Sequence, residues 1–431
     1  MSETTVILGA GLAGLSAAYH AKKLGKPHQL FEREAREGGL VRSERVNGFT
    51  FDYTGHLLHL SQARSRGLVL DELGLKNAFV TVERDAWVYL NKVFSRAPFQ
   101  ANLFGQPDSV IRECLEGILK AQGSPAPSGP ENFESWNLRN FGEGIYRHFM
   151  EPYNSKLWGL HPSKMSTAFM GRFVPKPSLA QVFEGALSEK PKNIGYNANF
   201  LYPRRGGIEV LARGFASHSA AHLGHIAVQI DLKAKEVSFA NGRRQRYGQL
   251  ISSLPLPRLV ALLKQKPAAI AQAASRLRAT SVMNVNLGVS GRDICSKQWI
   301  YVPEKNLPFY RVGFYHNFSK ELAPRGASSL YAEISHAPDK PLDKKKAVAQ
   351  VRKGLIAMGI LRPSDRIAAE FVTDIPSAYV VYDDHRAQSV GTIQAFLKKQ
   401  GVQSIGRWGN WEYASMEDAI WQGAEAVGWK Y

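Results

Sequence analysis

The spacing of apolar residues near the start of the chain changes period twice. Residues 4–8 form a short apolar run that predicts a strand, residues 12–24 have helical spacing, and residues 28–32 predict a second strand. A strand, a helix and a strand in this order indicate two parallel strands joined by a helical crossover. The chain is therefore predicted to open with a βαβ unit.

Helical and strand patterns alternate in long blocks over the rest of the chain. The pattern is mostly helical from 108 to 187, with a loop rich in Pro and Gly at 123–130. Helical patterns return at 343–358, at 391–400 and from about residue 416. Between these blocks the clearest β runs are 226–230, 236–239, 250–252, 282–289, 298–302, 310–315 and 329–334.

A glycine-rich turn joins the first predicted strand to the first predicted helix. Gly9, Gly11 and Gly14 have the spacing GxGxxG, whose glycines allow a tight turn, close approach of a pyrophosphate and close helix packing. Free amides at the start of the helix favour an anion there. Glu32 ends the second strand, where it can accept hydrogen bonds from a ribose. These features predict a dinucleotide site and disfavour NADP, because Glu32 would repel a 2′-phosphate.

A second pair of glycines separates FAD from NAD. Gly38 and Gly39 follow Glu32 closely, with Arg42 just beyond, which resembles the second signature of FAD-dependent amine oxidases and mutases. We therefore predict FAD as cofactor and an α/β fold, a doubly wound, Rossmann-like domain with a helical insertion and a mixed β-sheet insertion. The FAD-binding domain takes residues 1–85, 190–275 and 386–431, the mainly helical insertion 86–189, and the β-sheet insertion 276–385.

Charge narrows the class of ligand. The 55 Lys and Arg residues outnumber the 37 Asp and Glu residues, for a formal net charge of +18, which attracts anions at long range. The basic residues are scattered, and the two densest runs, 243–246 and 344–346, contain no aromatic residues. This distribution favours a phosphate-rich small ligand and predicts no nucleic-acid partner.

Cysteine content and hydropathy bear on the compartment. The only cysteines, Cys114 and Cys295, exclude a disulfide framework, fit a reducing compartment, and cannot form a zinc site alone. No apolar run is long enough to cross a bilayer, and the first residues do not have the pattern of a signal peptide. We predict a cytoplasmic protein without stable membrane insertion and without a metal site.

Six ordered blocks along the chain carry a more specific resemblance. One of them, 149–158, reads Phe-Met-Glu-Pro-Tyr-Asn-Ser-Lys-Leu-Trp, and another, 406–413, reads Gly-Arg-Trp-Gly-Asn-Trp-Glu-Tyr. These blocks resemble motifs of the UDP-galactopyranose mutases of the eukaryotic type, within the FAD-dependent amine oxidase and mutase superfamily. The other four blocks are 51–56, 97–102, 195–207 and 299–311.

The resemblance implies an isomerase that is active with reduced FAD and interconverts pyranose and furanose forms of an NDP-hexose such as UDP-galactose. Reduced flavin N5 would attack the anomeric carbon and expel UDP, and the flavin–sugar adduct would open and re-close before UDP returns. It also implies an NDP-sugar substrate, an external reductant such as NADPH, and a place in glycan biosynthesis. The oligomeric state stays open.

The resemblance also assigns roles to residues. Arg311 and Arg407 would clamp the diphosphate, and His56 would lie on the loop beside the flavin; these three form the predicted catalytic set. Gly406 and Met416 join the predicted cofactor contacts. The predicted substrate contacts are Phe99, Gln100, Asn154, Trp158, Asn197, Trp299, Tyr301, Tyr379 and Tyr413.

Three positions depart from the mutase pattern. Ala97 stands where an aromatic residue packs on uracil, Phe173 lies in a block that replaces Gly-Glu-Arg-Val near the flavin, and Met416 falls near an asparagine that contacts the nucleotide. The nucleotide and the sugar therefore stay open at this point.

Two other functions fit part of the same sequence. A conventional oxidase or desaturase of the amine oxidase or protoporphyrinogen oxidase type would share both glycine motifs, but it would not need Arg311 and Arg407. A flavin- or NDP-sugar-binding protein without turnover would also share them. Tyr301, Tyr379 and Trp299 suit a core as well as a binding wall, so the aromatic positions do not decide between these functions.

Overall fold

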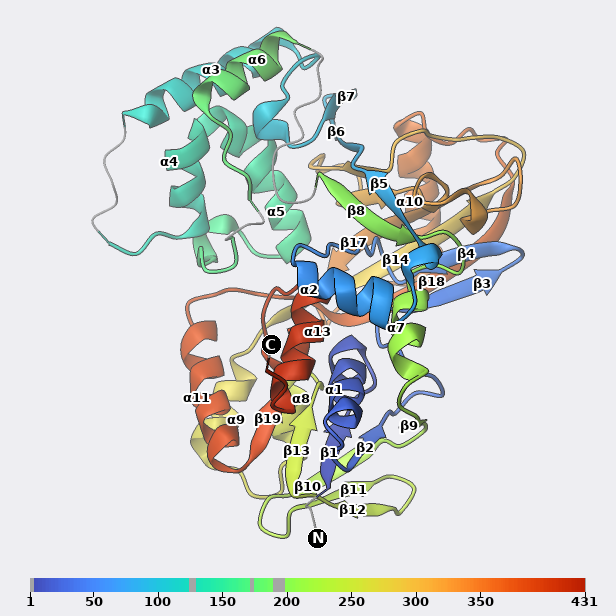
Figure 1. Cartoon of the computed structure of the whole chain (residues 1–431). Helices are drawn as coiled ribbons and strands as arrows, with labels where there is room; N and C mark the ends of the chain where they lie inside the picture. Colours follow the sequence, from blue (N-terminus) through green and yellow to red (C-terminus); the bar gives the residue numbers. More distant parts are fainter. Residues whose placement is uncertain (1–3, 124–128, 171–173, 189–197, 431) are drawn as a thin grey trace.

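A five-stranded sheet lies at the end of the molecule that holds the N-terminus (Figure 1). The computed structural model describes residues 4–123, 129–170, 174–188 and 198–430. All four strand pairings in this sheet are parallel, and β1 is buried along its whole length. In spatial order the strands are β19 (Val402–Ser404), β13 (Gln249–Ser252), β1 (Thr5–Leu8), β2 (His28–Phe31) and β9 (Ala221–His222).

Helices cover this parallel sheet. Two of them, α1 (Leu12–Lys23) and α13 (Met416–Ala426), pack together so closely that a Cβ on Gly423 would lie 2.3 Å from the carbonyl oxygen of Ala13. Apolar residues of α1, β1 and α13 form one hydrophobic cluster. The remaining helices of this part are α7 (Glu209–Ala216), α8 (Leu256–Leu262), α9 (Ala268–Ser275), α11 (Arg386–Lys399) and the short α12 (Gly406–Gly409).

A seven-stranded mixed sheet forms the second layer. Its pairings are antiparallel except for the parallel pair β15–β6. The strand β14, which lies next to the edge strand β18, is buried at almost every position, and α10 (Lys344–Ala357) packs near it with its apolar face. In spatial order the strands are β18 (Ile367–Val380), β14 (Ala279–Val289), β17 (Ser328–His336), β16 (Arg311–Gly313), β15 (Trp299–Tyr301), β6 (Ala86–Leu90) and β7 (Val93–Arg96).

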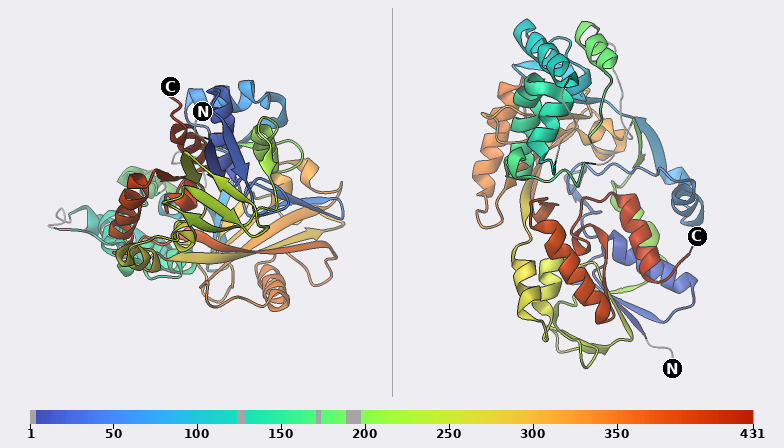
Figure 2. Two further views of the ribbon diagram at one scale, coloured as in Figure 1. Left: turned by 90° about the horizontal axis from the view of Figure 1, so that it is seen from below. Right: turned by 90° about the vertical axis from the view of Figure 1, so that its left-hand side faces the viewer.

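A group of helices stands at the end of the molecule opposite the N-terminus (Figures 1 and 2). It contains α3 (Asp108–Gln122), α4 (Phe133–Ile145), α5 (Glu151–Trp158) and α6 (Leu179–Leu187). Where α3 and α4 cross, a Cβ on Gly144 would lie 2.3 Å from the carbonyl oxygen of Glu113. The two backbones therefore approach more closely than larger residues would allow.

Shorter elements connect these parts. The pairs β3–β4 and β5–β8 and the sheet β10–β11–β12 are antiparallel, and α2 follows the loop after β4. Their bounds are Ser43–Val46 (β3), Phe49–Asp52 (β4), Ala63–Arg66 (α2), Phe79–Glu83 (β5), Asn199–Pro203 (β8), Ala227–Asp231 (β10), Glu236–Phe239 (β11) and Arg244–Arg246 (β12). Within the described ranges, no helix is both long and apolar enough to cross a membrane.

The predicted α/β fold is confirmed, with a parallel sheet, a helical group and a large mixed sheet. The opening βαβ unit and the helices between 108 and 187 occur where the pattern places them. One grouping is corrected: residues 86–96, assigned to the helical insertion, form β6 and β7 and extend the mixed sheet through the pairing of β6 with β15. The long strand β18 was not predicted at all.

Candidate functional site

A cavity of about 1140 Å³ is lined by the parallel-sheet part, the helical group and the mixed sheet. It extends from the glycine turn before α1 to α5 and to the strands β15, β16 and β17. The predicted site residues that line it are Gly9, Gly11, Glu32, Gly38, Gly39, Arg42, His56, Gln100, Asn154, Trp158, Trp299, Tyr301, Arg311, Tyr379, Gly406, Arg407, Tyr413 and Met416.

Three predicted site residues are not part of this lining. A Cβ on Gly14 would lie 1.9 Å from the carbonyl oxygen of Gly9, so Gly14 lets α1 pack against the turn. Phe99 is fully buried and stacks on Phe149 with ring centroids 5.2 Å apart, so it supports the wall from behind. Asn197 lies outside the described residues.

The start of α1 is built to approach a ligand closely. Gly9 has a φ of +93°, and α1 begins after Gly11 without a hydrogen bond from a capping side chain. The amide of Gly38 donates to the carbonyl of Ala10 (2.8 Å), and a Cβ on Gly39 would lie 3.0 Å from Cα of Gly11. The two glycine motifs, 24 or more residues apart in sequence, therefore form one cradle of backbone.

Glu32 borders this cradle with a carboxylate that the backbone holds in place. Its Oε2 accepts a hydrogen bond from the amide of Ala10 (2.7 Å), and its Oε1 accepts one from the amide of Glu34 (3.0 Å). A carboxylate has further lone pairs for ribose hydroxyls. Uncapped helix amides, close glycine backbone and a fixed carboxylate fit the pyrophosphate and ribose of FAD.

Hydrogen bonds to Asp52 hold the start of the loop that carries His56. The buried carboxylate of Asp52 accepts hydrogen bonds from the Ser43 hydroxyl (2.6 Å), the Tyr202 hydroxyl (2.5 Å) and the amide of Ile208 (3.1 Å). Burial raises the pKa of Asp52 to about 6, against the effect of these hydrogen bonds. Two residues later, Thr54 has a φ of +119°, a conformation that strains a β-branched residue.

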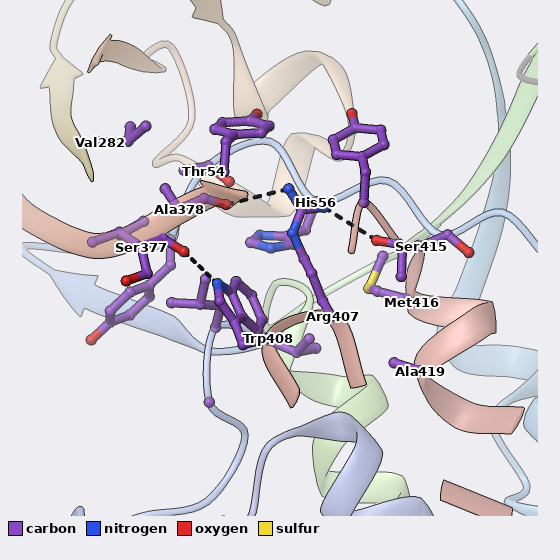
Figure 3. Close-up of a pocket in the computed structure, with 18 of the residues that line it drawn as sticks. Thr54, His56, Val282, Ser377, Ala378, Arg407, Trp408, Ser415, Met416 and Ala419 are labelled. Carbon is purple, nitrogen blue, oxygen red and sulfur yellow. Dashed lines mark hydrogen bonds between the residues drawn. The ribbon is translucent and has the colours of Figure 1, made fainter. Parts of the chain in front are cut away.

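His56 is a neutral imidazole at neutral pH. Burial, followed by the positive charges of Arg311 and Arg407, lowers the pKa of His56 to about 4. The three predicted catalytic residues, His56, Arg311 and Arg407, all line the same cavity. Figure 3 shows Arg407 extending from α12 beside His56, with a hydrogen bond to the Ala378 carbonyl.

Arg311 is held by the adjacent strand. It lies directly opposite Glu333 in the β16–β17 register, and its Nε and Nη2 donate to the two carboxylate oxygens at 3.0 and 2.7 Å. Glu333 is fully buried and also accepts a hydrogen bond from the Tyr310 hydroxyl. This bidentate pair fixes the guanidinium and leaves its other N–H groups for a ligand.

Arg407 has a different environment. Its Nη1 donates to the Ala414 carbonyl (3.2 Å) and its Nη2 to the Ala378 carbonyl (3.3 Å). The guanidinium carbon lies 4.6 Å from the ring centroid of Tyr413 and 5.2 Å from that of Tyr379. Within the described part of the chain it forms no salt bridge, and its buried Nε has no hydrogen-bond partner. Its positive charge is therefore available to an anion.

Aromatic rings form the wall between α5 and the arginines. The rings of Tyr379 and Tyr413 are stacked with centroids 6.1 Å apart, and Trp158 meets Tyr379 edge-on at 5.5 Å. Asn154 and Trp158 lie on one helical face, as the spacing predicts, and the indole N–H of Trp158 donates to Oδ1 of Asn154 (3.3 Å). The buried Nε1 of Trp299 has no hydrogen-bond partner among the described residues.

Sequence reasoning missed several residues of the site. Glu333, which fixes Arg311, is 22 residues away in the chain and only the strand register brings the two together. Tyr331 lines the cavity, and its hydroxyl would lie 2.1 Å from a Cβ on Gly55. Thr54 was included only as part of the block 51–56, and its φ of +119° became evident only in the structure.

Comparison with known proteins places the chain in a family. The profile of flavin containing amine oxidoreductases matches residues 12–426. Human protoporphyrinogen oxidase is 23% identical over 324 residues, which cover 68% of each chain. Protoporphyrinogen oxidase 2 of Arabidopsis thaliana is 23% identical over 266 residues, 56% of this chain and 51% of that protein, so the match spans about half of the plant relative.

Solved structures add a second kind of similarity. A crystal structure of reduced UDP-galactopyranose mutase superposes with a TM-score of 0.93 at 28% identity and covers 99% of this chain and 93% of that one. A putative protoporphyrinogen oxidase from Exiguobacterium sp. 255-15 has the same fold, with a TM-score of 0.77 at 18% identity. The chain belongs to the flavin containing amine oxidoreductase family, which implies an FAD-dependent enzyme.

Proposed function

We propose that this protein is an FAD-dependent mutase that interconverts the pyranose and furanose forms of a nucleoside diphosphate hexose, with UDP-galactose as the first candidate. The observation that carries the proposal is the pair of arginines in one cavity. Arg407 has no carboxylate partner within the described residues, and Arg311 keeps part of its fork free. Two such guanidinium groups suit a diphosphate.

The chain's own residues would assist departure of the diphosphate. Cleavage of the bond between the anomeric carbon and the phosphate oxygen leaves negative charge on the nucleoside diphosphate. Arg311 and Arg407 are positioned to stabilise that charge, and a neutral His56 adds no further positive charge between them. When bound in its reduced form, FAD supplies the nucleophile for the anomeric carbon.

The aromatic wall would protect the reacting sugar. Trp158, Tyr379 and Tyr413 pack edge-on or stacked on one another beside Arg407. Such a wall excludes water that would hydrolyse an activated sugar, and holds the leaving diphosphate near for recapture. The Nε1 of Trp299, which lacks a partner among the described residues, can donate to a sugar hydroxyl.

Further parts of the proposal concern the cellular setting. The reaction is redox-neutral but needs a reduced flavin, so an external reductant such as NADPH belongs to it. A cytoplasmic location is proposed because both cysteines, Cys114 and Cys295, are free thiols. The resemblance to the eukaryotic type and a place in glycan biosynthesis are proposed with the mutase activity.

A second candidate is an oxidase of the protoporphyrinogen oxidase type. It is favoured by the sequence relatives, which are protoporphyrinogen oxidases and a putrescine oxidase of Kocuria rosea that is 24% identical over 261 residues. Two arginines in one cavity suit a diphosphate better than the amino groups of an amine substrate such as putrescine. The 28% identical mutase structure, which covers 99% of this chain, supports the first candidate.

One anaerobic experiment separates the two candidates. The purified flavoprotein is reduced with dithionite, mixed with UDP-galactopyranose or UDP-galactofuranose, and the products are separated by anion-exchange chromatography. We expect interconversion by the reduced protein and none by the oxidised protein. No conversion, combined with no effect of UDP on the flavin spectrum, would overturn the mutase proposal. Oxygen-dependent turnover of a porphyrinogen or an amine would then support the oxidase.

A further inference from the structure

Lys156 is a partly buried cation beside the cavity that the proposed chemistry does not use. It lies on α5 between Asn154 and Trp158. Its Nζ donates hydrogen bonds to three backbone carbonyls, those of Val302 (2.9 Å), Glu304 (2.9 Å) and Phe309 (2.7 Å). We call these three carbonyls the carbonyl cage. An ammonium group has three N–H donors, so the cage satisfies all of them.

The carbonyl cage lies in the loop that connects two strands of the cavity wall. Before the loop, β15 carries Trp299 and Tyr301; directly after it, β16 begins with Arg311. The helix α5 forms the facing wall through Asn154 and Trp158. Lys156 is therefore a bridge between the helix and the strands that line the cavity.

Other contacts between the two walls show what Lys156 adds. Tyr153 meets the ring of Tyr301 edge-on, with centroids 5.4 Å apart. The hydroxyl of Ser335 donates to the carbonyl of Leu157 (2.8 Å) and joins α5 to β17. The loop itself is contacted by Tyr153, whose ring meets that of Tyr310 at 6.3 Å, and by Glu151, which pairs with the exposed Lys305 at 3.6 Å. The Lys156 ammonium differs from these contacts because one donor group binds backbone carbonyls near both ends of the loop, those of Val302 and Phe309.

We propose that Lys156 is a positioning residue: its ammonium, held in the carbonyl cage, sets the distance of α5 from β15 and β16 and so the width of the nucleotide-sugar site. The choice of ligand rests on the proposed function. The bridge between α5 and the loop does not depend on the proposed function, because it consists of contacts within the chain.

The bridge is sensitive to pH near neutrality. Burial lowers the pKa of Lys156 to about 7, and the carboxylate of Glu304 acts in the opposite direction. A neutral amine has two N–H donors for three carbonyls, so the bridge loosens as the pH rises through this value. The other charged groups on the surrounding segments are Glu151 on α5, Lys305 on the loop, Arg311 on β16 and Glu333 on β17.

The first test replaces the lysine and restores the ammonium from solution. UDP is the probe, and its dissociation constant for the FAD-loaded protein is followed through the flavin spectrum. We expect Lys156→Ala to weaken UDP binding by about tenfold, since small displacements of a binding wall have large effects. Added n-propylammonium, which matches the atoms removed beyond Cβ, should restore much of the affinity. Tetramethylammonium, which has no N–H donor, should not.

A matched control removes a longer, exposed ion pair between the same helix and loop, that of Lys305 with Glu151. Lys305 lies on the same loop, is highly exposed, and approaches Glu151 only at 3.6 Å. Lys305→Met should leave UDP binding unchanged. We expect the wild type to lose UDP affinity above about pH 7, and Lys156→Arg, which keeps a positive charge at all accessible pH values, to lack this loss.

The second test uses backbone hydrogen exchange in the loop. We expect amides of residues 302–309 to exchange faster in Lys156→Ala than in the wild type, and faster in the wild type at about pH 9 than at about pH 6 after correction for intrinsic rates. A folded Lys156→Ala protein with wild-type UDP affinity and wild-type loop exchange would overturn the proposal. If wild type does not bind UDP, the proposed function fails, while loop exchange still decides the bridge. If Lys156→Ala does not fold, the wild type alone decides: loop amides whose exchange does not depend on pH after correction for intrinsic rates would overturn the proposal.

Discussion

Arg407 is surrounded by rings and backbone carbonyls, with no carboxylate partner among the described residues. Arg407→Ala should lower turnover by about 100-fold or more, because a charge placed for the transition state is lost. Arg407→Lys keeps the charge but not the planar guanidinium, so its turnover should lie between that of the wild type and that of Arg407→Ala. FAD should stay bound in both variants, since the backbone cradle lies elsewhere.

The control for Arg407 is an exposed arginine of the small antiparallel sheet. Arg244 approaches Glu236 at 3.8 Å with a side chain that is 73% exposed, so Arg244→Ala should have wild-type turnover. Turnover and flavin content are measured on the same samples. Full activity of Arg407→Ala would remove Arg407 from the site.

Thr54 is a residue-scale source of strain next to His56. Its φ of +119° is suited to glycine, and a β-branched residue in such a conformation costs about 1–3 kcal/mol. Thr54→Gly should therefore raise the free energy of unfolding by about 1 kcal/mol, after the larger entropy of glycine in the unfolded chain is subtracted. Thr54→Ala keeps a Cβ and should give no such gain. Urea unfolding of the FAD-loaded proteins measures both, and a less stable Thr54→Gly would show that the strain is already relieved by other contacts.

At the scale of elements, sequence patterns predicted those parts whose burial follows a simple period. The βαβ unit was predicted because β1 is buried at every position and α1 is buried at every position from Leu12 to Ala21. Strand β18 was missed because it is a sheet-edge strand with Pro376 and exposed charged residues, so its burial does not alternate regularly. Strands β6 and β7 were grouped with the helices because β15, the strand that joins β6 to the mixed sheet, is more than 200 residues away.

The crossing of α3 and α4 gives an element-scale prediction. A Cβ on Gly144 would lie 2.3 Å from the Glu113 carbonyl oxygen, which is a backbone atom of α3 and cannot move aside as a flexible side chain could. Gly144→Ala should lower the free energy of unfolding by about 2 kcal/mol through overpacking. Gly67→Ala, at a position with nothing within 4 Å, is the control and should be neutral or slightly stabilising. Equal stability of both variants would mean that α3 and α4 can move apart without loss.

At the scale of the whole molecule, the candidate site depends on contacts that no local pattern contains. The dinucleotide fingerprint and the family resemblance together predicted 18 residues that line one cavity, but the pairing of Arg311 with Glu333 follows from strand register. The His56 loop is held by hydrogen bonds that Ser43 and Tyr202 donate to Asp52, and these three residues lie on three different strands. The sequence could therefore indicate which residues form the site, and the fold determines which of their charges remain free.

Buried histidines also make the stability of the whole molecule sensitive to acid. Burial lowers the pKa of His56 and of His20 from 6.5 to about 4. Between these values the unfolded chain binds protons that the folded chain does not, so stability falls as the pH falls, by about 3 kcal/mol per histidine. Asp52 acts in the opposite direction, because burial raises its pKa to about 6 and the folded chain holds a proton there that the unfolded chain releases.

His56→Gln isolates one of these contributions. Between about pH 7 and pH 4, the free energy of unfolding should fall by about 3 kcal/mol less in this variant than in the wild type, because glutamine binds no proton in either state. The control is His161→Gln, at an exposed position, which should follow the wild-type curve. Urea unfolding at several pH values, with FAD in excess, measures all three proteins. Parallel acid curves for wild type and His56→Gln would mean that the folded protein protonates His56 as readily as the unfolded chain does, and that burial and the two arginines do not keep the imidazole neutral.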